Sequence, residues 1–248
     1  MDGYEICILC FLFQDGLVKS NMEKLVWYAM HSPDKLDRIG EYLASRLDRD
    51  IQRRRTGYVV ISMDALDQLM LTCHANSLNL FVESFLQMIQ RLLESQEPML
   101  QLRAVQSFEK YSNIREETPQ YHRRYDFFVS KFASMCYYTE SDPDRQRQLR
   151  TAGIMGLQGV VRKTDCDDLG DSIWQPVHMD KIVPALLFNM GEKIAVTQEF
   201  EEADAEEADH HDQKREKKPN ELAEICLREL VCRATSGKIA KIIRPLLA

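Results

Sequence analysis

A group of basic residues in the segment 34–55 is the part of this sequence best suited to bind phosphate groups. When residues 34 to 53 are placed about 100° apart on a helical wheel, the basic ones fall within an arc of about 80°. These residues are Lys35, Arg38, Arg46, Arg49 and Arg53, and Arg54 and Arg55 extend the positive end. A face of one charge sign, with Tyr42 in its middle, suits phosphate-bearing lipid headgroups.

The remaining residues of this helix form two further sectors. Apolar residues centred about 120° from the basic ones mark the side that we expect to be buried. The acidic residues Asp34, Asp37, Glu41 and Asp48 occupy the third sector. Interleaved signs would favour pairing along the helix, whereas separated signs favour docking on an anionic membrane, at about 1 kcal/mol for each basic side chain.

Other interpretations of the basic residues stay open. A charged helix face most often serves solubility, and the same face is also suited to bind an acidic protein. Nucleic acid is less favoured, because the positive charge is confined to one short face and no nucleic-acid-binding motif accompanies it.

Cys7 and Cys10 form a Cys-x-x-Cys pair inside the apolar run 6–13. Metal binding is disfavoured, because no second pair and no suitably spaced histidine follows. Two acyl chains beside a basic surface would make a stable membrane anchor, so S-acylation is one interpretation, and a buried or frayed terminus with inert thiols is the other. The other cysteines that we expect in the core are Cys73, Cys136, Cys226 and Cys232.

Catalytic motifs are scarce. The chain has no Gly-x-Ser-x-Gly elbow, no phosphate-binding glycine loop and no His-Glu-x-x-His helix. The short run Gly170-Asp171-Ser172, with His178 nearby, resembles the start of a hydrolase block, but so short a motif on a helical chain favours a chance match. Gly153, Gly156 and Gly159 are spaced by three, which favours close helix packing over phosphate binding. His210 and His211 lie in an acidic stretch, where we expect them to be solvated.

Composition excludes several classes of protein. The 248 residues are 44% hydrophobic and 29% charged, with 10 Gly and 8 Pro, which is typical of a globular and mainly helical chain. The formal net charge is −7, and the segment 199–212 alone carries eight acidic residues, so the rest sums to −7 + 8 = +1. The longest apolar run is much shorter than the ~20 residues of a membrane-spanning helix, and the scattered cysteines favour a reduced, cytosolic protein.

Helical periodicity accounts for most of the chain. A capping box at Ser20 and Glu23 predicts a helix over 22–31, and Ser32 with Pro33 predicts the start of the next, which runs to about residue 54. Pro184 is expected to bend a later helix. Further apolar stripes predict helices over 59–73, 81–92, 100–111, 128–135, 149–160, 182–190 and 222–230.

Successive helices recurring in pairs at about 40 residues predict an all-α fold, an armadillo/HEAT-like α-solenoid of antiparallel helix pairs. The predicted organisation has four parts. They are an apolar amino-terminal segment (1–14), the α-solenoid (15–196), an acidic then basic disordered loop (197–220) and a continuation of the solenoid (221–248) that we expect to be cut short.

From Asp15 onward the sequence resembles the amino-terminal part of the rolling blackout (stambha A) family, the plasma-membrane anchors of the type III alpha phosphatidylinositol 4-kinase. The resemblance covers long stretches in order and with similar spacing, among them DGLVKSNMEKL, DKLDRIGEYLASRLDRD, FVESFLQMIQRLLESQEP and HMDKIVPALLFNM. Residues 1–14 diverge from the usual family start, which carries a dense cysteine cluster.

The resemblance implies a non-catalytic scaffold without a cofactor, docked on anionic phospholipids at the cytoplasmic face of the plasma membrane. It would help to localise the kinase complex for phosphatidylinositol 4-phosphate synthesis. The implied partners are tetratricopeptide-repeat and hyccin-type subunits, bound mainly through a carboxy-terminal region that this chain lacks. The resemblance also implies acylation near the amino terminus, carried onto Cys7 and Cys10. A cytosolic protein-interaction solenoid without membrane contact is the alternative, and a lipid hydrolase using Ser172 and His178 is the weakest.

Overall fold

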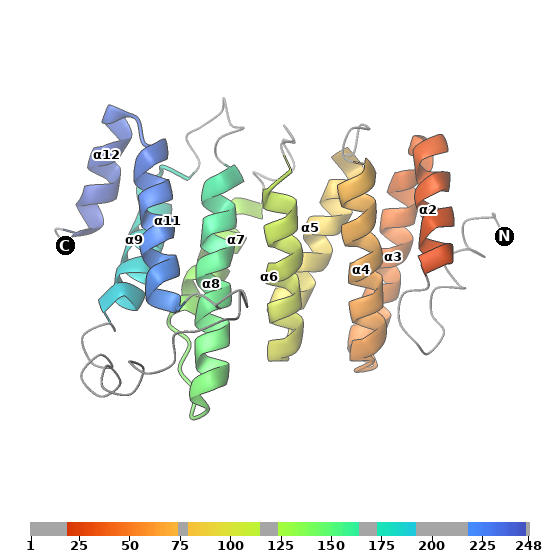
Figure 1. Ribbon diagram of the computed structural model, residues 1–248, viewed down its shortest axis with the longest axis horizontal. Helices are drawn as coiled ribbons and strands as arrows, with labels where there is room; N and C mark the ends of the chain where they lie inside the picture. Colours follow the sequence, from red (N-terminus) through yellow and green to blue (C-terminus); the bar gives the residue numbers. More distant parts are fainter. Residues whose placement is uncertain (1–18, 74–78, 115–123, 164–172, 192–217, 247–248) are drawn as a thin grey trace, which may run out of the picture. The chain divides into compact units, whose positions relative to one another are not determined.

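The apolar periodicity of the sequence becomes a series of helices in the computed structural model (Figure 1). The structure describes residues 19–73, 79–114, 124–163, 173–191 and 218–246. Within these ranges every regular element is an α-helix or a short 3-10 helix, so the predicted all-α class is confirmed. The chain divides into two compact units, Met1–Phe127 and Phe128–Ala248.

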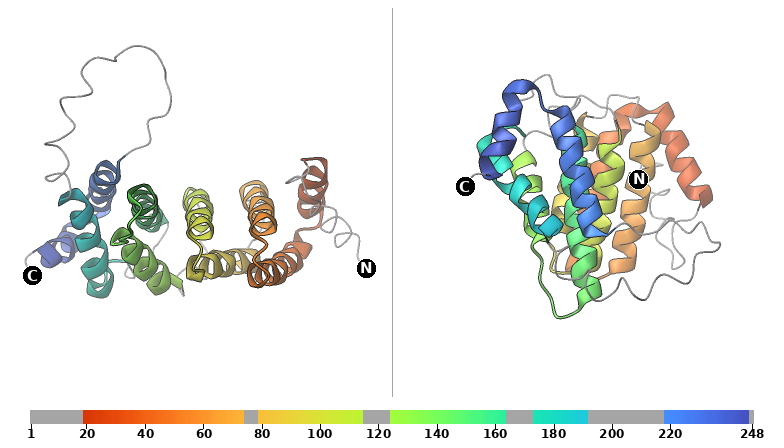
Figure 2. Two further views of the ribbon diagram at one scale, coloured as in Figure 1. Left: turned by 90° about the horizontal axis from the view of Figure 1, so that it is seen from below. Right: turned by 60° about the vertical axis from the view of Figure 1, so that its left-hand side comes forward.

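The first unit stacks its helices in two layers (Figure 2). Helices α2, α4 and α6 follow one another in one layer, and α3 and α5 lie in the other. Helix α3 also packs against α4, and α5 against α6, so each layer supports the next. The elements are α2 (Lys19–His31), η1 (Pro33–Lys35), α3 (Leu36–Gln52), α4 (Thr56–Cys73), α5 (Asn79–Glu94) and α6 (Pro98–Ser112).

Aromatic side chains fill the core of the first unit. Phe85 and Phe108 each contact Tyr111, with ring centroids 5.8 Å and 6.1 Å apart, and all three side chains are buried. Gly40 on α3 lets this helix approach α5, because a Cβ atom there would lie only 3.1 Å from the Phe81 ring. The position of α3, which carries the predicted basic face, is therefore fixed by tight packing.

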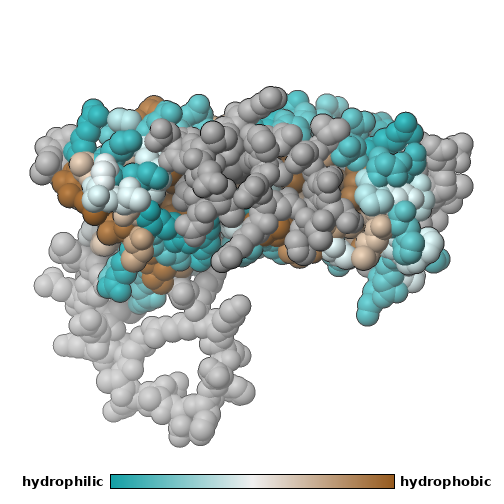
Figure 3. Space-filling model, turned by 90° about the horizontal axis from the view of Figure 1, so that it is seen from above, coloured by the Kyte–Doolittle hydropathy of each residue, from teal (hydrophilic) through white to brown (hydrophobic). Residues whose placement is uncertain are grey.

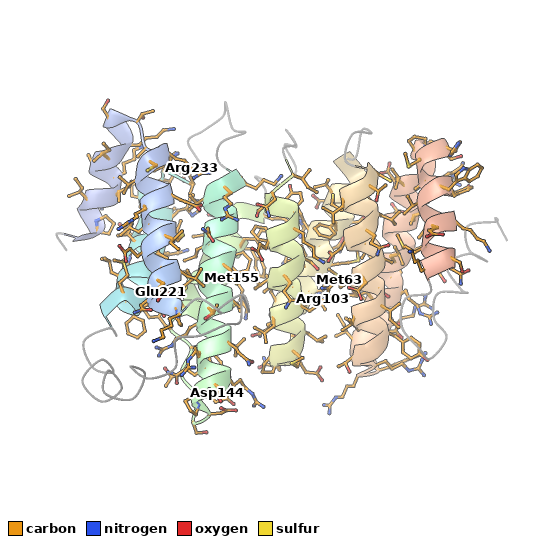
Figure 4. All side chains as sticks on the ribbon, in the orientation of Figure 1. Met63, Arg103, Asp144, Met155, Glu221 and Arg233 are labelled. Carbon is orange, nitrogen blue, oxygen red and sulfur yellow. The ribbon has the colours of Figure 1, made fainter. Side chains whose placement is uncertain are left out.

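An ion-pair network joins α4 to α6 in the same unit. Arg103, labelled in Figure 4, lies on α6 and reaches the Oδ2 atom of Asp67 on α4 at 2.9 Å. Lys110 donates to the same oxygen at 2.7 Å, and Arg103 also pairs with Asp64. The Asp67 side chain is only 2% exposed, whereas that of Asp64 is 40% exposed.

The second unit begins at Phe128, inside α7, and contains the rest of that helix and the helices that follow it. Helix α11 packs against both α8 and α9, and α12 lies against α9. Pro184 lies inside α9, which continues beyond it to Gly191. The elements are α7 (Tyr125–Cys136), α8 (Pro143–Lys163), α9 (Pro176–Gly191), α11 (Pro219–Arg233), α12 (Ser236–Ile243) and η4 (Arg244–Leu246).

The glycines of α8 allow this helix to approach α7 very closely. A Cβ atom on Gly153 would lie 2.8 Å from the Cys136 backbone nitrogen, and one on Gly156 would overlap the Phe132 ring. Gly159 is buried as well. The predicted role of the spacing of three in close helix packing is therefore confirmed for Gly153 and Gly156.

One predicted helix start is wrong, and the other is right in position but lacks the predicted capping bond. Helix α2 begins at Lys19, so Ser20 lies inside the first turn and cannot cap the helix as predicted. Ser32 precedes the next helix, but its side chain makes no capping hydrogen bond, and Pro33 opens the 3-10 turn η1 before α3 begins at Leu36. The predicted loop lies mostly outside the described residues, and α11 begins at Pro219, within its last two residues.

Candidate functional site

The acidic sector of α3 faces the helix that follows it in the same layer. The Asp37 carboxylate accepts a hydrogen bond from the Phe81 backbone N–H near the start of α5, and burial raises its pKa. Asp48 lies 3.8 Å from the guanidinium of Arg91, also on α5. Gly40, which packs against Phe81 of α5, lies about 160° around the helix from the centre of the basic sector, so that sector faces away from α5.

The seven predicted basic residues, which we call the basic stripe, differ in exposure. Lys35 and Arg46 are half-buried, and the other five, Arg38, Arg49, Arg53, Arg54 and Arg55, are exposed. Figure 3 shows hydrophilic residues over much of the described surface visible at the end of the first unit that holds α2 and α3. The structure thus presents most of the stripe to solvent.

Arg46 has a local partner. Its Nε atom donates to the Oδ2 atom of Asp50 at 3.2 Å, and the Asp50 side chain is 2% exposed. A buried carboxylate requires such a partner, so Arg46 serves the fold. Lys35 lies 3.2 Å from Asp34, but that carboxylate is 70% exposed and constrains it weakly.

The five exposed arginines form no ion pair with any described carboxylate. Arg49 is oriented along α3, because its Nε atom donates to the Ser45 backbone carbonyl at 3.2 Å. A row of exposed guanidinium groups without acidic partners can donate several hydrogen bonds to phosphate oxygens. Such an arrangement is suited to anion binding, and arginine side chains supply neither a nucleophile nor a general base.

The end of α3 aims the last two arginines. The Arg54 N–H donates to the Ile51 carbonyl at 3.0 Å and the Arg55 N–H to the Asp50 carbonyl at 2.9 Å, the pattern of a Schellman motif. Arg54 occupies the left-handed position of this motif, with φ of 54°, where glycine is the usual residue. The sequence therefore keeps a positive charge at a position where the backbone favours glycine.

We expect Arg54→Gly to raise the free energy of unfolding by about 0.5–1 kcal/mol, because glycine adopts this backbone conformation without strain. Arg53→Gly is the matched control, since it removes the same charge at a position with φ of −88° and should not stabilise the chain. Urea denaturation of both variants gives the comparison. An Arg54→Gly variant that unfolds at lower urea than the parent chain would show that the position is not strained.

Helix α2 carries two exposed apolar side chains that the sequence analysis did not single out. Trp27 is 62% exposed and Met30 is 52% exposed, whereas Met22, Leu25 and Ala29 form the buried side of the helix. The sequence could have predicted this exposure. Met22, Leu25 and Ala29 define the buried side at helical spacing, and Trp27 and Met30 lie outside it.

The cysteine predictions divide in two. Cys73, Cys136 and Cys226 are buried as expected, and burial raises the pKa of the Cys226 thiol to about 12. Burial likewise raises the pKa of the Cys136 thiol far above its usual range. The prediction for Cys232 is wrong, because its position on α11 turns it toward solvent. Cys7 and Cys10 lie outside the described residues.

Catalytic, metal-binding and membrane-spanning features are not found in the described ranges. His178 is buried at 2% exposure on α9, and Gly170, Asp171, Ser172, His210 and His211 lie outside those ranges. No group of three or more histidine, cysteine or acidic side chains in the described part of the chain is arranged to hold a metal ion. None of the described helices combines the length and apolar character needed to cross a bilayer.

Comparison with known proteins identifies the family. The model of the family described as EFR3, armadillo repeat, matches residues 22–248. Over 95% of its own length, the chain is 54% identical to the human protein EFR3 homolog A. It is 54% identical to mouse EFR3 homolog B and 52% identical to the Drosophila melanogaster EFR3 homolog cmp44E, each over 94% of its length.

The chain spans 28% of the length of these curated relatives. No solved structure matches it. The match covers nearly the whole chain, and the residues matched by the family model, 22–248, include α3 and the basic stripe. The resemblance seen in the sequence is confirmed, and the chain belongs to the EFR3 family of armadillo-repeat proteins.

Proposed function

We propose that the chain is the membrane-docking part of a non-catalytic scaffold at the cytoplasmic face of the plasma membrane. The basic stripe binds anionic phospholipids of the inner leaflet. The whole protein helps to localise a phosphatidylinositol 4-kinase complex for phosphatidylinositol 4-phosphate synthesis, with tetratricopeptide-repeat and hyccin-type subunits as partners bound mainly outside this chain. Palmitoylation of Cys7 and Cys10 would add to the electrostatic attraction.

One observation carries the membrane proposal. The five exposed arginines of the stripe lie on and beside one helix and form no ion pair with described carboxylates. Each basic side chain near an anionic leaflet contributes about 1 kcal/mol, and the attraction falls off within a Debye length. Arginines on one side of α3 and at its end can approach an anionic surface together, so their contributions add.

The test is flotation of the recombinant, unacylated chain with vesicles of phosphatidylcholine and phosphatidylserine, with and without phosphoinositide. The variant neutralises Arg38, Arg49 and Arg53 with glutamine and leaves Arg46 in place, since Arg46 neutralises the buried Asp50. At low salt the triple variant should lose about 3 kcal/mol of attraction to the vesicles, which corresponds to about 100-fold weaker binding. Physiological salt should reduce the binding of the parent chain.

The matched control changes the same net charge elsewhere. Arg147, Arg228 and Arg244 are exposed residues of the second unit that do not belong to the basic stripe, so their replacement by glutamine should leave flotation within about twofold. Equal losses in both triple variants would mean that net charge alone drives binding. No flotation of the parent chain would reject direct docking and favour a cytosolic solenoid that binds other proteins.

A further inference from the structure

The exposed face of α2 is unusual for a helix that packs in a stable unit. Its buried side consists of Met22, Leu25 and Ala29, each at most 2% exposed. Trp27 lies about 165° around the helix from the centre of that side, so it points directly away from the core. Met30, one turn later, joins it on the solvent side. Two large apolar side chains that share one exposed face indicate a contact surface.

The indole of Trp27 is held in place by its neighbour on the next turn. The ring of His31 stacks on it, with centroids 4.1 Å apart and an interplanar angle of 27°. His31 Nδ1–H donates to the Trp27 backbone carbonyl at 2.8 Å, which fixes the imidazole. A side chain that is ordered before binding loses little conformational entropy when it binds.

Trp27 and the basic stripe face the same end of the first unit. Helix α2 packs on α4, and Trp27 lies on the side of α2 opposite to its buried residues. The basic sector of α3 faces away from α5, because it lies about 160° around the helix from Gly40, which packs against Phe81 of α5. Figure 2 shows that α4 follows α2 in one layer and α5 follows α3 in the other, in the same direction. Both surfaces therefore face away from the rest of the unit.

We propose that Trp27, together with Met30, inserts into the interfacial region of the anionic leaflet while the basic stripe binds the phosphates beside it. This inference rests on the proposed function and names the side chains that enter the bilayer. Tryptophan is favoured at the level of the lipid headgroups, where its apolar ring is buried and its N–H keeps a polar partner.

The charges around Trp27 favour a lipid surface over a protein as the binding partner of this face. Lys19 and Lys24 are exposed on α2, and Glu23 is the one acidic residue of this helix. An apolar groove on a protein would have to desolvate these lysines and the nearby arginines. A membrane interface receives both kinds of side chain, because cations stay at the phosphate level while the indole lies slightly deeper.

Fluorescence tests the insertion directly, since the chain contains two tryptophans and the other, Trp174, is buried. A Trp174→Phe variant leaves Trp27 as the only tryptophan. On addition of phosphatidylserine vesicles its emission should shift to the blue, and lipids brominated on the acyl chain should quench it. If Trp174→Phe does not fold, the same quenching is measured in the parent chain and should vanish in Trp27→Ala.

Affinity gives the second readout. Trp27→Ala should weaken binding to anionic vesicles about fivefold, and the loss should persist at high salt because it removes apolar burial and not charge. Met99→Ala is the control, since Met99 is 72% exposed on α6, away from this face.

The outcomes separate this inference from the proposed function. If the parent chain floats but Trp27→Ala floats equally and Trp27 emission is unchanged, the insertion is wrong and electrostatic docking stands. If the parent chain does not float, both are wrong. A blue shift that appears without vesicles and grows with protein concentration would assign the face to a second copy of this chain and overturn the insertion.

Discussion

Replacing Gly156 with valine is expected to lower the free energy of unfolding of the second unit by about 3 kcal/mol or more. A Cβ atom at this position would overlap the Phe132 ring on α7, and valine adds two further methyl groups on the same side. Overpacking a well-filled contact costs about 1–3 kcal/mol, and this contact leaves an aromatic ring no room to shift without separating two helices. Urea denaturation followed by circular dichroism measures the loss.

Gly237→Ala is the matched control for this prediction. Gly237 lies in α12 of the same unit, and a Cβ atom there would meet nothing within 4 Å. The change should therefore be neutral or stabilise the unit by up to about 1 kcal/mol, because alanine is the better helix former. Similar destabilisation by both variants would show that the glycines act through backbone flexibility and not through the contact between α7 and α8.

The sequence predicted features that depend on residues a few positions apart. The spacing of Gly153 and Gly156 identified a helix side that must be small, and the tight contact with α7 bears this out. The segregated charges of α3 likewise predicted distinct sectors, and Asp48 on the acidic sector does face α5. In both cases one helix determines the pattern, so its periodicity is sufficient.

Features that depend on tertiary packing were not predictable. Asp50 falls between apolar neighbours of α3, and only its burial reveals that Arg46 must neutralise it. Cys232 lies among apolar residues in sequence, yet α11 packs on α8 and α9 through other positions. Ser20 has the residue type of a cap, but where a helix begins also depends on the preceding chain and on packing.

In the first unit, Asp67→Ala is expected to lower the free energy of unfolding by about 3 kcal/mol. The substitution removes the buried carboxylate that Arg103 and Lys110 share, and both cations then lose this partner. The Asp67 side chain is 2% exposed and accepts from both Arg103 and Lys110, which come from the neighbouring helix α6. This loss of stability lies at the lower end of the range for broken buried ion pairs, because Arg103 still forms an ion pair with Asp64.

Two comparisons isolate the cause. Asp64 also pairs with Arg103, but its side chain is 40% exposed. Asp64→Ala should therefore lower the free energy of unfolding by less than about 1 kcal/mol. Replacing the whole network with apolar residues, as Asp67→Leu with Arg103→Met and Lys110→Met, should recover much of the stability. Equal losses for Asp64→Ala and Asp67→Ala, measured by urea denaturation, would show that burial does not set the energy of the pair.

The same variant also separates the fold from the docking surface. Asp67 lies in the contact between α4 and α6. The basic stripe on α3 faces away from α5, and Trp27 on α2 faces away from α4. While the first unit remains folded, Asp67→Ala should therefore bind anionic vesicles within about twofold of the parent chain, since interactions without shared contacts are close to additive. A larger loss of binding below the unfolding transition would mean that the network positions α2 and α3, and the docking surface would then extend further into the unit than the stripe and Trp27.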